Sequence, residues 1–173
     1  MNNSTIIIGI DPGTRVTGYG IIALTNQGIQ AIDYGCIRPP PDELLSTRYL
    51  IIFDSIQMLL AQHCPPEQSE MAIETQFVQK NAQVTIKLGM ARAAAVIAGK
   101  KQNLKIFGYA PREVKCFISG TGNASKAQLQ QVVGRFLNLK QPPEPYDAAD
   151  ALSIAICHAH RRQNQFFDKV KEL

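Results

Sequence analysis

The 173-residue sequence lacks the features of membrane, secreted and disulfide-bonded proteins. No apolar run of about 18 residues or more is present, so no segment is expected to span a membrane. The N-terminus has no positive cluster ahead of an apolar stretch and no small-residue cleavage site, so we expect no secretory signal. The cysteines are scattered without close pairing, which is typical of reduced thiols in a cytosolic protein: Cys36, Cys64, Cys116 and Cys157.

Acidic residues are almost missing from one long stretch of the chain. From Lys80 to Lys140 there are eleven Lys or Arg residues and one acid, Glu113, although the whole chain carries only +4. Ordinary surfaces intersperse both signs. A plain solvated surface is the alternative, but an excess of this size favours a surface that faces a polyanion, and we expect a nucleic-acid partner.

Familiar catalytic loops and repeats are also missing. The sequence has no Walker-type phosphate loop, no Gly-x-Ser-x-Gly elbow and no internal repeat. What remains is a composition of 45% apolar and 18% charged residues, which is typical of a globular protein with a real core. We expect one domain over residues 1–163 and a polar C-terminal tail over residues 164–173 that frays.

Hydrophobic periodicity predicts a mixed α/β fold. Three short strands joined by turns form an antiparallel meander, and Gly18 and Gly20 in the second strand indicate a bulge or a close approach of another backbone. The later strands alternate with helices, as in parallel crossovers. The predicted strands are 6–10, 17–24, 29–37, 71–74 and 105–109, and the predicted helices are 46–63, 81–98, 111–117, 125–137 and 146–161. The sum is a five-stranded mixed sheet flanked by helices.

Four carboxylates stand where such a fold can bring them together. Asp11 and Glu74 each end a buried strand, and if those strands are parallel neighbours both acids lie at one edge of the sheet. Asp147 and Asp150 are three residues apart and project from one face of the last helix. The alternatives are a turn cap for Asp11 and helix capping for Asp147.

A cluster of oxygen ligands without Cys or His suits a hard cation, Mg²⁺ or Mn²⁺. Two such ions roughly 3.5–4 Å apart would assist attack of water on a phosphodiester. The Cys157-His158-Ala-His160 segment resembles a metal cluster on paper, but neighbouring helical residues point in different directions and zinc spacing is missing.

Three segments resemble the RuvC family of crossover-junction endonucleases: GIDPGTRVTGYG (residues 9–20), IETQFVQKN (73–81) and DAADAL (147–152). The resemblance implies an RNase H-like (retroviral integrase-like) fold. It also implies a Mg²⁺-dependent homodimer with about two ions per site that resolves Holliday junctions. Paired, symmetric nicks would leave 5′-phosphate and 3′-hydroxyl ends, and a RuvA–RuvB branch-migration complex is the implied partner. The implied catalytic and metal-binding acids are Asp11, Glu74, Asp147 and Asp150.

The resemblance also implies residues that meet DNA. Phe77 would stack on or wedge between bases at the opened junction, where the alternative is an anchor for its loop in the core. Lys115 and Lys126 match positions where the family has basic residues on the DNA backbone, although surface lysine is the plain alternative. Arg15, Lys80 and Lys87 are weaker candidates of the same kind. The small-residue helix 81–98 is the implied dimer contact, or else it lies flat on its own sheet.

Two departures and three other functions stay open. Thr75 stands where glutamine commonly follows the glutamate of the second motif, and prolines fill positions 39–41. Asp11-Pro-Gly13-Thr14 also resembles the phosphate loop of actin-like and sugar-kinase ATPases, which use two domains. A YqgF-like RNase H-fold nuclease acting on RNA is a second alternative. A nucleic-acid-binding module without catalysis is the third, although an uncompensated acid cluster would only repel DNA.

Overall fold

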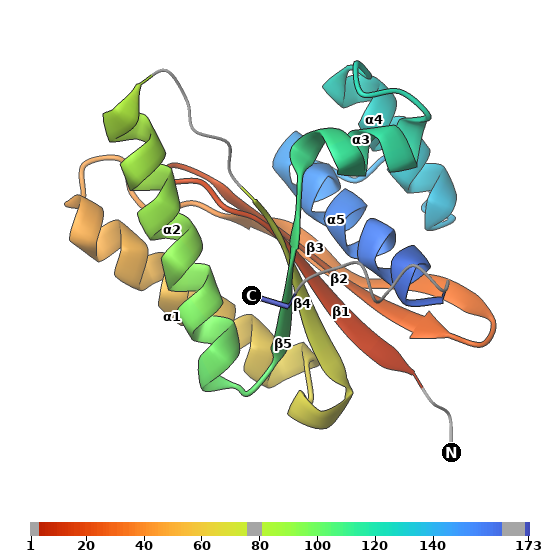
Figure 1. Cartoon of the computed structure of the whole chain (residues 1–173), viewed down its shortest axis with the longest axis horizontal. Helices are drawn as coiled ribbons and strands as arrows, with labels where there is room; N and C mark the ends of the chain where they lie inside the picture. The colour runs from red at the N-terminus through yellow and green to blue at the C-terminus, as the bar shows by residue number, and fades with distance from the viewer. Residues whose placement is uncertain (1–3, 76–80, 164–171) are drawn as a thin grey trace.

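The computed structural model describes residues 4–75, 81–163 and 172–173 (Figure 1). Its strands form one five-stranded sheet in the order β3-β2-β1-β4-β5. β2 is antiparallel to both β1 and β3, whereas β4 is parallel to both β1 and β5. The predicted meander and the predicted parallel crossovers are therefore confirmed. The strands are β1 (Thr5–Asp11), β2 (Thr17–Thr25), β3 (Gly28–Ile37), β4 (Ser69–Glu74) and β5 (Lys105–Tyr109).

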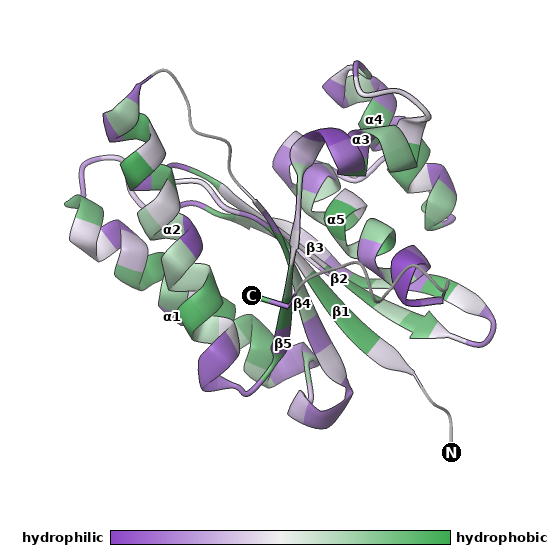
Figure 2. Cartoon of the chain, in the orientation of Figure 1, coloured by the Kyte–Doolittle hydropathy of each residue, from purple (hydrophilic) through white to green (hydrophobic). Residues whose placement is uncertain are grey.

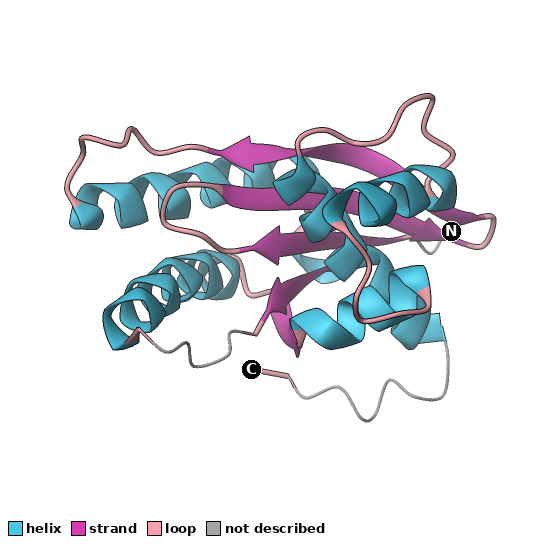
Figure 3. Cartoon of the chain, turned by 90° about the horizontal axis from the view of Figure 1, so that it is seen from above, coloured by secondary structure: helices cyan, strands magenta, loops and turns pink. Residues whose placement is uncertain are grey.

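Five α-helices cover the two faces of the sheet. α1 (Leu45–His63) and α2 (Ala82–Lys101) pack on one face, and α3 (Pro111–Ser119), α4 (Lys126–Phe136) and α5 (Tyr146–Gln163) on the other (Figures 1 and 3). A short 3₁₀ turn, η1 (Pro66–Gln68), precedes β4. α2 runs three residues past its predicted end, to Lys101, and is followed by the C-cap Gln102 and by Asn103, where φ is +59°.

The alternation of side chains along the strands divides the core in two. Ile8 and Ile10 of β1 pack with α1 and α2, whereas Ile7 packs with α5 on the opposite face. Gly9 and Asp11 are two and four residues after Ile7, so they share its face. The strands are largely hydrophobic, whereas α3 is amphipathic, with purple residues on its outer face and Val114 and Ile118 buried (Figure 2). The acid at the tip of β1 therefore points toward the α5 side of the sheet.

Glycines let α5 lie directly on the strands. A Cβ atom at Gly9 would overlap the Ala151 carbonyl oxygen, and one at Gly18 would overlap the Asp147 carbonyl oxygen. Only glycine permits this approach of two backbones. The close approach predicted for β2 is thus confirmed at Gly18. Its consequence is that the first turns of α5, which carry acidic residues, sit over β1 and β2.

The last two residues pair with the open edge of β5. The Leu173 amide donates to the Ile106 carbonyl at 2.9 Å, and Glu172 forms a β-bridge with Phe107. Lys100 of α2 adds an ion pair to Glu172 at 3.1 Å. The prediction of a fraying tail is wrong for these two residues, because edge-strand hydrogen bonds hold them. Residues 164–171 lie outside the described residues.

Among the described residues, no helix has both the length and the apolar character needed to cross a membrane.

Candidate active site

Two strand tips bring two carboxylates to one edge of the sheet. The parallel pairing of β1 with β4 ends at Ile10 opposite Ile73, and the next residues along the two strands are Asp11 and Glu74. Asp11 is also paired with Gly18 across the antiparallel side of β1. Because Gly18 has no side chain, nothing from β2 separates Asp11 from the helix above it. The predicted meeting of the two strand-end acids is therefore present in the fold.

The last helix supplies a third carboxylate to the same place. A pocket of about 240 Å³ is lined by Asp11, Glu74 and Asp150, together with side chains from α3, α4 and the second turn of α5: Pro111, Val114, Lys115, Lys126, Leu129, Ser153 and Ile154. Asp147 does not line this pocket, but its charge acts on both Asp11 and Asp150. The four predicted acids thus form one electrostatic cluster, with three of them around a common cavity.

The protonation of these acids reflects their crowding. Burial raises the pKa of Asp11 to about 7, and the charges of Asp150 and Asp147 add to the effect. Burial also raises the pKa of Glu74 to about 8, with further contributions from Asp11 and Asp150. The pKa of Asp150 is raised by burial as well, although Lys126 opposes this shift. Desolvated like charges of this kind call for a cation.

Two lysines stand at the rim of the acid pocket. Lys126 Nζ lies 3.5 Å from Asp150 Oδ2, and Lys115 of α3 lines the same cavity. Lys126 opens α4 directly after the N-cap Ser125, whose side chain forms a capping box with Gln128. The helix dipole disfavours a cation at that position, so the neighbouring carboxylates compensate for it. The structure therefore brings Lys115 and Lys126 to the predicted acids.

The donor set fits a hard divalent cation. Carboxylate oxygens that lie partly out of water, with raised pKa values, gain from a cation that replaces their protons. Across the described ranges, no group of three or more His, Cys, Asp or Glu side chains is already arranged around a single ion position. Mg²⁺ commonly takes only one or two carboxylates and completes its shell with water and substrate phosphates, so this arrangement suits it.

The remaining predicted site residues are not gathered into the pocket. Arg15 is exposed in the loop between β1 and β2, and Lys87 is exposed on α2. Phe77 and Lys80 lie outside the described residues. His158 is fully buried, whereas His160 is exposed and packs on the Phe117 ring, so these histidines have different surroundings.

A further basic residue borders the acids and was missed in the sequence. Asp11, Gly18 and Cys36 are aligned across β1, β2 and β3. Burial raises the pKa of the Cys36 thiol; the positive charge of Arg38 works against this, and the negative charge of Asp147 adds to it, so both charges lie nearby. Arg38 is exposed and directly follows Ile37, the last residue of β3, so its place at a strand end was the sequence signal for it.

Comparison with known proteins identifies a family for this chain. The family model for crossover junction endodeoxyribonuclease RuvC matches residues 7–158. Crossover junction endodeoxyribonuclease RuvC of Protochlamydia amoebophila is 48% identical over 169 residues, which cover 96% of this chain and 99% of the relative.

Solved structures of Thermus thermophilus RuvC are similar along almost the whole chain. One has a TM-score of 0.83 at 27% identity and covers 98% of this chain and 100% of its own. Another, described as RuvC in complex with a Holliday junction substrate, has a TM-score of 0.83 at 26% identity, with coverage of 98% and 99%. These matches confirm the predicted RNase H-like fold.

Proposed function

Because the chain belongs to the RuvC family of crossover junction endodeoxyribonucleases, we propose that it resolves Holliday junctions by hydrolysing DNA phosphodiester bonds. One observation carries the proposal for this chain. Asp11, Glu74 and Asp150, from three different elements, line a single pocket together with Lys115 and Lys126. A nuclease of this kind needs carboxylates for divalent ions and cations for the DNA backbone, and the pocket offers both.

Asp11, Glu74, Asp147 and Asp150 would hold Mg²⁺, or Mn²⁺ in its place, with two ions in each site. Bound ions supply an activated water and neutralise the charge that develops on the phosphate and on the leaving oxygen. The carboxylates would fix the positions of the ions, and thereby the position of the water in line with the bond that breaks. Lys115 and Lys126 hold adjacent phosphates against the rim. Breaking the bond between phosphorus and the 3′-oxygen leaves a 5′-phosphate and a 3′-hydroxyl.

A homodimer would give the paired nicks. A four-way junction has approximate two-fold symmetry, so two symmetric cuts require two sites related by a two-fold axis. The outer face of α2 supports this assembly, since Ile86, Met90 and Ile97 are 62%, 50% and 59% exposed. Their spacing of four and seven residues places them on one stripe of the helix. This stripe lies within the segment that the family resemblance suggests as the dimer contact.

Further contacts belong to the same proposal. Arg15 and Lys87 are exposed and would meet the DNA backbone, as would Arg38 beside the acids. Phe77 would stack on a base at the junction centre, and Lys80 would bind a nearby phosphate. The protein would act in the cytoplasm, where the RuvA–RuvB branch-migration complex would present the junction.

Cleavage assays on matched substrates test the proposal. The protein is incubated with a synthetic four-way junction, a linear duplex of the same arms and an RNA–DNA hybrid, each with Mg²⁺ or with chelator. We expect paired nicks in the junction alone and only with Mg²⁺, while junction binding persists in chelator. Asp11→Asn should abolish nicking and retain binding. Cleavage of the hybrid would favour an RNA nuclease instead, and ATP hydrolysis would favour the actin-like alternative.

A further inference from the structure

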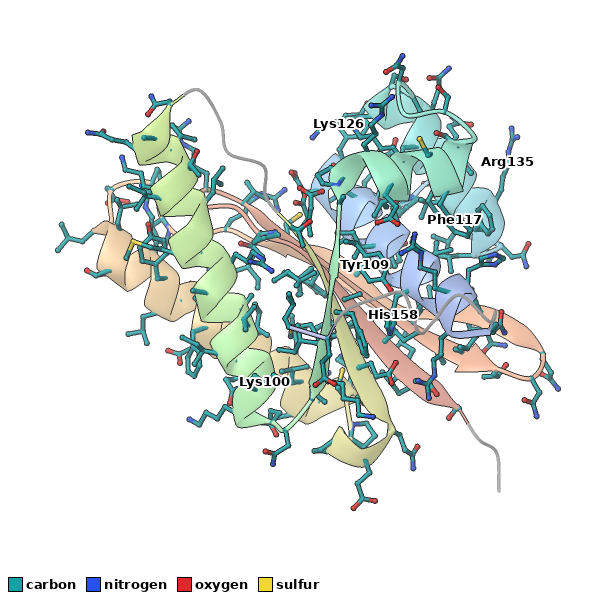
Figure 4. All side chains as sticks on the ribbon, viewed as in Figure 1. Lys100, Tyr109, Phe117, Lys126, Arg135 and His158 are labelled. Atoms are coloured by element: carbon teal, nitrogen blue, oxygen red, sulfur yellow. The ribbon has the colours of Figure 1, made fainter. Side chains whose placement is uncertain are left out.

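A buried polar network lies at the other end of α5 from the acidic pair. His158 Nδ1 is 2.6 Å from the Tyr109 hydroxyl, and His158 Nε2 is 2.9 Å from Glu70 Oε2. His158 and Tyr109 have no exposed surface, and Glu70 is 7% exposed. Figure 4 shows Tyr109 and His158 together where β5 passes α5. None of these three side chains lines the acid pocket.

The direction of the hydrogen bond between His158 and Glu70 follows from the charge of Glu70. Burial works to raise the pKa of Glu70, but the hydrogen bond from His158 and the charge of Arg162 outweigh it, so the pKa lies below its ordinary value. An ionised carboxylate only accepts, so Nε2 of His158 donates to Glu70. On the other side of the ring, Nδ1 pairs with the Tyr109 hydroxyl. Arg162 donates to the other Glu70 oxygen at 2.6 Å.

Each member of the network shares an element with a site residue. Glu70 and Glu74 are four residues apart in β4 and point to the same face. Tyr109 is paired in register with Glu74, and its carbonyl accepts from the Thr75 amide at 2.7 Å. His158 follows Asp147 by eleven residues, which is three helical turns, so both lie on the sheet-facing stripe of α5.

The acid-bearing half of α5 meets the strands through close steric contacts. The Asp147 carbonyl lies against Gly18, Ala151 and Ala155 rest on Gly9, and Leu152 fits over Gly20. Apolar and steric contacts limit how closely the helix approaches the sheet, but they are not directional. Hydrogen bonds add a directional restraint, because they weaken steeply when distance or angle changes. In coiled coils, a buried polar residue can fix the register of one helix against its neighbour.

We propose that Glu70, His158 and Tyr109 are positioning residues that set the register of α5 against β4 and β5, and thereby the distance of Asp147 and Asp150 from Glu74. This inference rests on the proposed function, since it concerns the spacing of the acids that would hold Mg²⁺. The network acts through the helix and touches no substrate. Its loss should therefore weaken divalent-cation binding and leave binding of the junction unchanged.

Two variants and a matched control test this role. Tyr109→Phe removes one oxygen from the network without changing its shape, and His158→Gln breaks it more severely. Ile156→Val removes one buried methyl group from the same helix and keeps every polar contact. Mn²⁺ binding is measured by calorimetry on the DNA-free protein, junction binding by fluorescence anisotropy in chelator, and the Mg²⁺ concentration for half-maximal cleavage in parallel.

We expect both network variants to weaken Mn²⁺ binding about tenfold, the lower end of the range for residues that orient metal ligands. The half-maximal Mg²⁺ concentration should rise by a similar factor, with junction affinity as in the wild type. Wild-type affinity for Mn²⁺ in Tyr109→Phe, or an equal loss in Ile156→Val, would overturn the positioning role. A wild-type protein that neither binds Mn²⁺ nor cuts the junction would instead overturn the proposed function.

Discussion

At the scale of single residues, Lys126 should contribute to DNA binding more than to folding stability. The Lys126 side chain is 57% exposed in its ion pair with Asp150, whereas that of Asp150 is 17% exposed, so Lys126→Met should cost about 1 kcal/mol of unfolding free energy. Junction affinity should fall, and the slope of log affinity against log salt should decrease by roughly 1, because one phosphate contact is lost. Anisotropy titrations across a range of NaCl concentrations measure both quantities.

Lys105→Met is the control for this measurement, since Lys105 is exposed at the opposite end of β5 from the acid pocket. It removes the same charge from the protein and should leave the salt slope unchanged. Equal slopes for Lys126→Met and the wild type would remove Lys126 from the DNA-binding surface.

Asp11 should destabilise the metal-free fold at neutral pH. Its pKa is about 7 in the folded protein, against an ordinary 3.8. Between these two pH values Asp11 is ionised in the unfolded chain and protonated in the folded protein. The loss of unfolding free energy caused by Asp11 therefore grows from about pH 4 and levels off above about pH 7. Asp11→Asn should therefore raise the thermal midpoint in chelator at pH 8 by several degrees and leave it almost unchanged at pH 4.

Thermal denaturation followed by circular dichroism at the two pH values measures the change in the thermal midpoint. The corresponding gain in unfolding free energy is at most about 1.4 kcal/mol for each unit of the pKa shift. A stabilisation of the same size at pH 4 would mean that the asparagine acts through packing and not through charge.

Residue patterns alone could place three of the acids but not their environment. Local sequence predicts that Asp11 and Glu74 end strands and that Asp150 lies on a helix. Strand alternation and the helical period then decide where these side chains point, and all three reach the pocket. The pairing of Lys126 with Asp150, and the partners of His158, depend on how α4 and α5 pack on the sheet. Such long-range packing leaves no periodic signal in the sequence. For His158 the sequence therefore showed only that its spacing from Cys157 and His160 does not suit a zinc site.

At the scale of secondary-structure elements, the contact of α5 with β2 controls the position of Asp147. Gly18→Ala would force the helix backbone away from the strand, because the new methyl group would overlap the Asp147 carbonyl. Overlap with backbone cannot be relieved by a change of rotamer, so we expect a stability loss of about 1–3 kcal/mol. Junction cleavage should fall at least tenfold at limiting Mg²⁺, while junction binding persists.

Gly35→Ala in β3 is the matched control, since its methyl group would meet the side chain of Tyr19, at 2.9 Å from the hydroxyl oxygen and 3.1 Å from the nearest ring carbon, and no backbone atom is among these nearest neighbours. Chemical denaturation and cleavage assays on the two variants compare the contacts directly. Equal effects at both positions would show that the sheet, and not the contact with α5, is sensitive to the added methyl.

Elements were easier to predict than their contacts. Each strand and α-helix was predicted close to its observed bounds, because apolar periodicity and turn residues act locally. Glycines within β2 indicated a close approach of some backbone, but only the structure identifies α5 as the partner. The sequence gives no indication that Glu172 and Leu173 pair with β5, because two residues after a polar segment are too few to form a strand pattern.

At the scale of the whole molecule, the exposed stripe on α2 should decide the oligomeric state. Apolar side chains so exposed on one helix face favour association over solvation. Replacing Ile86 and Met90 together with Glu would place charges in the contact between two copies, and we expect a monomer by sedimentation or light scattering. The fold should remain intact, because neither side chain belongs to the core around α1 and α2.

The same variant should separate single nicks from paired ones. Each monomer keeps the acid pocket, because a single chain already brings Asp11, Glu74 and Asp150 together. It should therefore nick a junction in one strand at a time, and on a supercoiled cruciform plasmid the nicked circle should accumulate before the linear product. Ile32→Glu is the control, since the Ile32 side chain of β3 is 41% exposed, and it should leave both the dimer and the paired cuts unchanged. A dimer that survives the double substitution would move the interface to another surface, and a monomer that still makes simultaneous paired cuts would break the link between two-fold assembly and symmetric cleavage.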